Sequence, residues 1–305
     1  MFASVLLVGV AYREEPCRSA LNPVKGMGFG WSLNPYMGCA HRCTFCYVRA
    51  YELRADRPSD DRYGRSIRVK TNVAEVLRRE LTRPSWKGEA VAIGAATDPY
   101  QPVEGRYRLT RGCLEVLRDA ANPFSIITRG PMIVRDLDVL VEAARRADVS
   151  VTFSVPTLDE EVWRRTEPGT AHPRQRLRAL RELVDAGVRA SVGMAPILPG
   201  ISDRPEQLTA VVRAAREAGA CGIWSNVLYL RPGTREHFLE SVANEWPELL
   251  PMYERLYARR AYLKAADTEP IRAQVRELAR QHSIRDRRHT RLVPEPKPEQ
   301  LMFPL

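Results

Sequence analysis

Short apolar runs alternate with amphipathic segments through the middle of the chain. The runs are rich in β-branched residues and bounded by turn residues, which is typical of buried strands. They cover residues 90–95, 124–128, 149–155, 190–195 and 222–228. The segments between them repeat apolar residues at helical spacing, and Gly187 and Gly219 follow two of these segments as C-caps. With a first strand at 32–36, the pattern predicts six parallel strands joined by helices.

The two ends of the chain carry a different pattern. Residues 12–30 hold several prolines and glycines and predict an irregular extension, while 54–70 is charged and predicts a surface loop. Residues 236–264 and 270–281 have helical spacing, and prolines make the tail over 294–305 extended. We therefore expect three parts, namely an N-terminal extension over 1–30, a core over 31–232, and a helical C-terminal extension over 233–305 with a Pro-rich tail.

The composition indicates the cellular location of the protein more clearly than it indicates a binding partner. The chain has 305 residues and a formal net charge of +10, which permits a nucleic-acid partner or reflects a genome that favours arginine. Six cysteines, half of them in one loop, favour a reducing cytoplasm over a disulfide scaffold. The apolar residues 2–11 fall short of the ~20 that span a bilayer and follow no basic residue. We expect an outer strand or a mis-set start codon there, no signal peptide and no membrane partner.

Three cysteines lie within eight residues of each other in the segment Asn34 to Val48. Cys39, Cys43 and Cys46 have the spacing C-x3-C-x2-C, and three thiols in so tight a loop cannot all pair in disulfides. Thiolates suit zinc or an iron–sulfur cluster. No fourth ligand is obvious, because His41 points away if the cysteines on either side of it face one centre. The set therefore favours a cluster with one open iron, and a zinc site stays the alternative.

The same motif, with an aromatic residue, Phe45, before its last cysteine, resembles the signature of the radical S-adenosylmethionine (SAM) superfamily. Asn34-Pro35-Tyr36 and the segment TDPYQPVE over 97–104 are similar to the spore photoproduct lyase-like subgroup, whose members are labelled DNA repair photolyases by similarity. The resemblance covers Trp31 to Pro232. It implies an α/β fold with a partial (β/α)6 TIM-type barrel, a [4Fe-4S] cluster on the three cysteines, and SAM chelated by the open iron.

The resemblance also implies SAM contacts at the carboxyl ends of the strands, where α/β barrels hold their chemistry. After the second strand an acidic residue would bind the SAM ammonium. This chain lacks the usual Gly-Gly-Glu there and offers Asp98 or Glu104, of which Asp98 lies nearer the strand end. The other expected contacts are Ser154 on the ribose, Arg176 on the carboxylate, and Phe45, Gly193 and Asn226 around adenine. A solvated helix face is the alternative for Arg176, and an ordinary turn for Asp98.

These observations predict a radical SAM enzyme. The resemblance implies reductive cleavage of SAM to a 5′-deoxyadenosyl radical, which takes hydrogen from a substrate that the sequence does not identify. An external electron donor of the flavodoxin or ferredoxin type would reduce the cluster. A nucleic acid is a candidate substrate, with DNA suggested by analogy with lesion repair; a modification enzyme acting on RNA, a peptide or a small metabolite is the alternative. The alternative function is a non-catalytic, zinc- or iron–sulfur-containing nucleic-acid-binding protein. Neither a catalytic side chain nor an oligomeric state follows from the sequence.

Overall fold

The computed structural model describes residues 9–287, 290 and 292. A seven-stranded sheet forms its centre, in the order β10-β9-β8-β7-β6-β3-β2. The strands β3 to β10 of this sheet run parallel, and β2 is antiparallel at its edge. The strands are β2 (Leu21–Pro23), β3 (Trp31–Leu33), β6 (Val91–Ile93), β7 (Phe124–Thr128), β8 (Val149–Ser154), β9 (Arg189–Ile197) and β10 (Ile223–Val227). The predicted six parallel strands of a partial barrel are confirmed.

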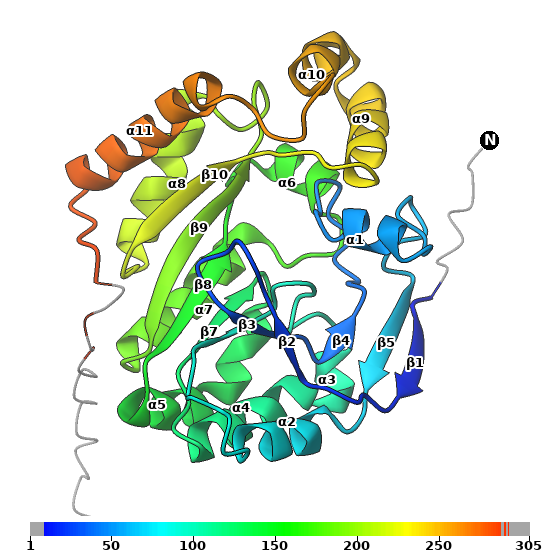
Figure 1. Ribbon diagram of the computed structural model, residues 1–305. Helices are drawn as coiled ribbons and strands as arrows, with labels where there is room; N and C mark the ends of the chain where they lie inside the picture. The colour runs from blue at the N-terminus through cyan, green and yellow to red at the C-terminus, as the bar shows by residue number, and fades with distance from the viewer. Residues whose placement is uncertain (1–8, 288–289, 291, 293–305) are drawn as a thin grey trace, which may run out of the picture.

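Helices connect the parallel strands. Figure 1 shows α2, α4, α5 and α8 along the lower and left-hand margins of the sheet. They bury their apolar stripes: in α4, for example, Cys113, Leu114 and Leu117 are fully buried, and each such leucine contributes roughly 1.5–3 kcal/mol. The connecting helices are α2 (Val73–Leu81), α3 (Glu104–Tyr107), α4 (Leu109–Asp119), η1 (Pro131–Asp136), α5 (Leu137–Arg146), α6 (Glu160–Thr166), α7 (Pro173–Asp185) and α8 (Pro205–Glu217).

A second, three-stranded sheet corrects two predictions. It pairs β1 (Ala11–Glu15), β5 (Ser66–Lys70) and β4 (Tyr36–Met37) in the order β1-β5-β4. Strands therefore occur where the charged sequence predicted an irregular extension and a loop. In β5 the side chains of Ile67 and Val69 alternate inward and are fully buried, a period-two signal that the surrounding charges obscured. The expected first strand is divided, because β3 and β4 belong to different sheets.

The C-terminal helices close the open side of the sheet. Helix α11 (Ala265–Gln281) begins before the predicted residue 270 and lies along β10 and α8 (Figure 1). Helices α9 (Thr234–Glu245) and α10 (Leu250–Tyr257), joined by η2 (Pro247–Leu249), share an apolar cluster with Cys43 and Phe45. The C-terminal helices thus support the cysteine loop directly. The strand expected over 2–11 falls mainly, and the Pro-rich tail entirely, outside the described residues.

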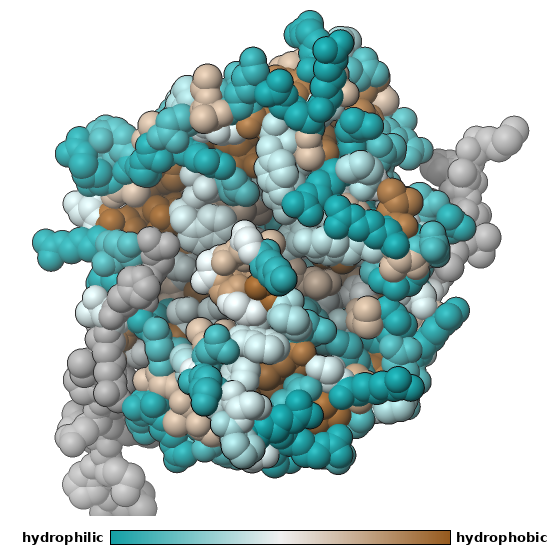
Figure 2. Space-filling view, in the orientation of Figure 1, coloured by the Kyte–Doolittle hydropathy of each residue, from teal (hydrophilic) through white to brown (hydrophobic). Residues whose placement is uncertain are grey.

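The described surface is polar at its margins. Figure 2 shows strongly hydrophilic side chains around the rim of one face, with weakly polar and apolar ones in its middle. In the part of the chain that the structure describes, every helix falls short of the length and apolarity that crossing a bilayer demands.

Candidate active site

The cysteine loop forms one wall of a cavity of about 70 Å³. Cys39 and Cys43 are buried and Cys46 is half-buried, and all six cysteines of the chain are free thiols. The facing walls come from the segments that follow β6 and β7, the carboxyl ends of two parallel strands. These walls include Gly94, Thr97, Asp98, Thr128 and Arg129. The three cysteines therefore lie where an α/β barrel places its chemistry.

The thiols are held in a dry environment. Burial raises the pKa of Cys43 to about 12, and it raises that of Cys39 as well, with further help from the nearby Asp98 carboxylate. Arg129 opposes the shift at Cys43. Metal binding must therefore displace thiol protons. Within the described residues, no group of three or more His, Cys, Asp or Glu side chains gathers as closely as a single metal ion requires. Three soft donors without a fourth suit an iron–sulfur cluster.

Two side chains from the segment after β6 clamp the start of the cysteine loop. The Thr97 hydroxyl donates to the carbonyl of Gly38 at 2.6 Å. The Gln101 amide donates to the same carbonyl at 3.1 Å and accepts from the Ala40 N–H at 2.9 Å. Both side chains are buried, so these hydrogen bonds satisfy backbone groups that water does not reach. The motif downstream of the cysteines thus serves to position them.

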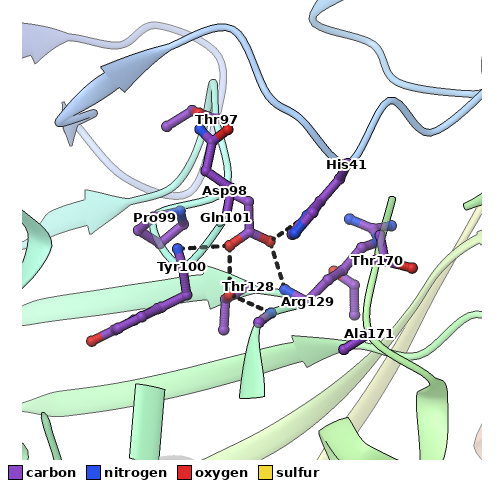
Figure 3. Close-up of polar contacts among 12 residues, drawn as sticks. His41, Thr97, Asp98, Pro99, Tyr100, Gln101, Thr128, Arg129, Thr170 and Ala171 are labelled. Atoms are coloured by element: carbon purple, nitrogen blue, oxygen red, sulfur yellow. Dashed lines mark hydrogen bonds and ion pairs between the residues drawn. The ribbon is translucent and has the colours of Figure 1, made fainter. Parts of the chain in front are cut away.

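Asp98 lines the cavity, and its carboxylate oxygens already accept hydrogen bonds from neighbouring residues (Figure 3). Its carboxylate accepts from the Thr128 hydroxyl at 2.7 Å, from the Arg129 N–H at 2.7 Å and from the Tyr100 N–H at 2.9 Å. His41 Nδ1 lies 3.3 Å away. Burial alone would raise the pKa of Asp98, yet the His41 pair and the hydrogen bonds hold it at about 2. Asp98 is therefore an ionised tie between the loop and β7.

Glu104 does not reach the cavity. It lies in α3, fully buried, and accepts hydrogen bonds from the Tyr36 hydroxyl and from the Thr110 N–H at 2.9 Å. Arg135 pairs with it at 2.8 Å. The structure therefore separates the two acidic candidates, and it leaves Asp98 as the one beside the cysteines.

Arg176 and Ser154 form part of the buried framework. The Arg176 guanidinium is fully buried, donates to the Ser154 carbonyl at 2.8 Å and pairs with Glu167 at 2.7 Å. The alternative of a solvated helix face was wrong, because the face of α7 that carries Arg176 packs inward. Ser154 is buried at the end of β8. Both residues lie outside the wall of the cysteine cavity.

The three residues expected around adenine are dispersed. Phe45 is buried, with the Arg129 guanidinium 5.5 Å from the centre of its ring. At Gly193 a Cβ would lie 2.8 Å from the indole of Trp224, so the strand pairing itself requires glycine there. Asn226 accepts from Arg272 Nη2 at 2.7 Å and lines a separate cavity. Of these contacts, only that of Phe45 involves a residue of the cysteine cavity, namely Arg129.

Arg129 and Glu167 are site residues that the sequence did not identify. Arg129 Nε donates to Glu167 Oε2 at 3.0 Å, and the same oxygen accepts from Arg176. Glu167 is fully buried, yet its Oε1 has no hydrogen-bond partner among the described residues. A buried carboxylate oxygen without a donor is costly, which suits it to a cationic ligand group. Arg129 had a sequence signal, since it directly follows a strand; Glu167 had none.

The family model of the radical SAM superfamily matches residues 33–210. This stretch is more than half of the chain. It holds the cysteine loop and the first five parallel strands, except for the first residues of β3. The chain belongs to the radical SAM superfamily. Membership implies a [4Fe-4S] cluster and SAM as cofactors and supports radical SAM catalysis. Three thiols on one cavity, with Arg129 on its wall and Glu167 paired to that arginine, fit such a pair of cofactors.

Relatives of this radical SAM protein occur in bacteria and in viruses. An uncharacterized protein of Mycobacterium tuberculosis is 39% identical over 280 residues, which cover 90% of this chain and 82% of the relative. A radical SAM Nalpha-GlyT isomerase of Pseudomonas phage M6 is 27% identical over 168 residues, 55% of this chain and 33% of that protein.

Among solved structures, the fold is similar to that of spore photoproduct lyase complexed with dinucleoside spore photoproduct. The TM-score is 0.67 at 14% sequence identity, over 89% of this chain and 79% of the lyase. This likeness establishes the shared architecture of the two proteins.

Proposed function

We propose that this radical SAM enzyme removes a hydrogen atom from a nucleotide of DNA, at the cavity bounded by Cys39, Cys43 and Cys46. One observation carries the proposal: the three thiols of a single loop line the same cavity as the residues that follow β6 and β7. Cluster, SAM and substrate would therefore meet where the strands of the barrel end.

Different residues around that cavity would bind different parts of the two cofactors. Cys39, Cys43 and Cys46 would hold the cluster. Glu167 Oε1 would accept the SAM ammonium, and the Arg129 guanidinium would face its carboxylate, since the two side chains are already paired at 3.0 Å. When bound, the cluster would supply the one-electron reduction of SAM that makes hydrogen-atom removal from a substrate possible. The buried walls would exclude water from this chemistry.

The proposal that the substrate is DNA is supported by two observations that do not concern the cavity. The spore photoproduct lyase structure that shares this fold holds a dinucleoside. The net charge of +10 favours a polyanionic partner. An external flavodoxin- or ferredoxin-type protein would deliver the electron.

The test is anaerobic turnover of the reconstituted, dithionite-reduced protein with SAM, with 5′-deoxyadenosine as the readout. Cys43→Ala should bind less iron and sulfide and form no 5′-deoxyadenosine. Cys17→Ala is the matched control, because Cys17 is a free cysteine whose backbone bonds to Asn72, away from the cavity. The control should retain iron, sulfide and product. Formation of 5′-deoxyadenosine by Cys43→Ala, or a purified wild-type protein that holds zinc instead of iron, would overturn the proposal.

A further inference from the structure

Four tyrosines form a continuous row from the cysteine cavity to the surface. Tyr47 lines the cavity, and its ring centre lies 6.0 Å from that of Tyr51 and 6.2 Å from that of Tyr229. Tyr229 stacks on Tyr262 with ring centres 4.9 Å apart and planes within 16°. Tyr262 is 52% exposed, unusual for so large a ring. We call these residues the tyrosine row.

The tyrosine row joins the family core to the C-terminal extension. Tyr51 belongs to α1 (Arg49–Arg54), and Tyr229 follows β10. Tyr262 lies in the loop between α10 and α11, beyond the residues that match the family model. The Leu230 N–H donates to the Ala261 carbonyl at 2.8 Å and so fixes this loop beside the segment that leaves β10 (Figure 1). The extension thus adds the exposed end of the row.

Arginines without carboxylate partners accompany the row. The Arg54 guanidinium lies 6.0 Å from the centre of the Tyr51 ring. That of Arg231 lies 5.7 Å from the Tyr262 ring and donates to the Tyr262 hydroxyl at 2.8 Å. Arg259 and Arg260 are exposed in the same loop as Tyr262. Across the described part of the chain, none of these four arginines forms a salt bridge.

The acidic residues nearby do not cancel this charge, because other arginines neutralise them. Glu52 pairs with Arg57 at 2.5 Å. Glu236 accepts from the Gly233 N–H and lies 3.3 Å from Arg235. The exposed end of the row therefore presents the Tyr262 ring among arginines that have no carboxylate partner within the described residues.

A small cavity of about 210 Å³ opens beside the exposed end of the row. Tyr229 and Tyr262 form its aromatic wall. Its polar groups come from Asn226, Thr268, Glu269 and Arg272, and the Glu269 carboxylate is paired with Arg276. Arg272 Nη2 donates to the Asn226 side chain, but its buried Nε has no partner among the described residues. An aromatic wall with an unsatisfied buried donor matches a planar, hydrogen-bonding ligand such as a nucleobase.

We propose that the tyrosine row is a binding surface for single-stranded DNA, and that an unpaired base of the strand enters the adjoining cavity. Bases stack on tyrosine faces regardless of sequence, while arginines bind the phosphates. The base in the cavity accepts a hydrogen bond from Arg272 Nε. The strand then continues along Tyr229 and Tyr47 toward the cysteines, which an enzyme acting on an extruded nucleotide requires. This inference rests on the proposed function, since it names how the DNA substrate is held.

The experiment measures fluorescence anisotropy of a labelled oligothymidylate of about 20 nucleotides, binding to the full-length protein. Tyr262→Ala should weaken binding about tenfold, because one stacking face is lost. Tyr107→Ala is the matched control. The Tyr107 ring centre lies 5.0 Å from the Arg106 guanidinium and 6.3 Å from that of Tyr12, but this tyrosine ends α3 and packs against the small sheet, in another part of the fold. The control should bind like wild type, and wild-type affinity should fall steeply between about 50 and 200 mM salt.

Several outcomes would overturn the inference. They are equal affinity of Tyr262→Ala and wild type, duplex DNA binding more tightly than the single strand, or the matching RNA binding more tightly than DNA. Formation of 5′-deoxyadenosine by the wild-type protein in the absence of DNA separates the two proposals, because it requires the cysteines and SAM but no bound strand. If wild type makes 5′-deoxyadenosine while Tyr262→Ala binds DNA normally, this inference alone fails. If Tyr262→Ala loses DNA binding but wild type makes no 5′-deoxyadenosine, the proposed function alone fails.

Discussion

His41 Nδ1 lies 3.3 Å from Asp98 Oδ2, and both side chains are buried. The pair joins the cysteine loop to the segment after β6 (Figure 3). Because the same carboxylate also accepts from Thr128 and from the Arg129 N–H, one side chain ties the loop to the ends of two strands. The position of the cysteines therefore depends on an acidic residue that contributes no metal ligand of its own.

Replacing Asp98 by asparagine should loosen this tie. An asparagine side chain carries no negative charge to attract His41. Its NH₂ group would replace one carboxylate oxygen and would then face N–H and O–H donors, from which it cannot accept a hydrogen bond. We expect Asp98→Asn to lower the free energy of unfolding by about 2–3 kcal/mol, because buried partners are left unsatisfied. We also expect lower iron content after reconstitution. Urea unfolding of the cluster-free protein and iron analysis measure the two effects.

Asp138→Asn is the control for this substitution. Asp138 likewise has a basic partner, Arg111 at 2.7 Å, but its side chain is 64% exposed. Exposed pairs contribute about 0–1 kcal/mol, so the control should unfold and take up iron nearly like wild type. Equal losses in the two variants would show that Asp98 has no special role in holding the loop.

The order of strands and helices was predictable because each strand depends on a local pattern. β7, for example, occupies Phe124–Thr128 as predicted, since its apolar run is bounded by Pro123 and Gly130. The strands of the small sheet were missed because their signal is short and mostly charged. β1 exposes three of its five residues, and its pairing with β5 depends on residues about 55 positions away.

The site was less predictable than the fold because its interactions join distant segments. Asp98 was identified from its place after a strand, but its ion pair with His41 follows only from the folded loop. Arg176 sits on a helix whose arginines look solvated in sequence, and burial against Glu167 decides otherwise. Glu167 itself lies in an ordinary turn sequence, and only its contact with Arg129 marks it as part of the site.

Gly169 tests whether close packing also positions the cysteine loop. Its N–H donates to the His41 carbonyl at 3.1 Å, and a Cβ there would lie 2.4 Å from the Ala40 carbonyl oxygen. Gly169→Ala should therefore push the loop outward, lower the free energy of unfolding by about 1–3 kcal/mol and reduce iron uptake. Thermal or urea unfolding and iron analysis after reconstitution provide the measurements.

Gly105→Ala serves as the comparison for Gly169→Ala. At Gly105, in α3, a Cβ would meet Met132 at an ordinary 3.5 Å, and alanine is favoured over glycine in helices by about 1 kcal/mol. This variant should be as stable as wild type or more so, with full iron content. If Gly169→Ala also binds iron fully and unfolds like wild type, the loop adapts easily and its packing against Gly169 does not position the thiols.

His237 should make the stability of the protein depend on pH. It lies in α9, and its buried Nδ1 has no hydrogen-bond partner among the described residues. Burial, and then the positive charge of Arg49, lower the pKa of His237 to about 4. In the unfolded chain the pKa is about 6.5, so between these values the unfolded state binds a proton that the folded state does not. Stability from this residue is therefore complete above about pH 6.5 and is lost as the pH falls toward 4.

The measurement compares wild type with His237→Gln, whose side chain does not titrate, by urea unfolding of the cluster-free proteins at about pH 7 and pH 4.5. Partial exposure reduces the effect, so wild type should lose about 1–2 kcal/mol more than the variant on acidification. Because burial is the larger cause, added salt should preserve most of this difference, whereas a shift due mainly to Arg49 would be screened. A wild-type protein that loses no more stability than His237→Gln would show that water reaches this imidazole in the folded state.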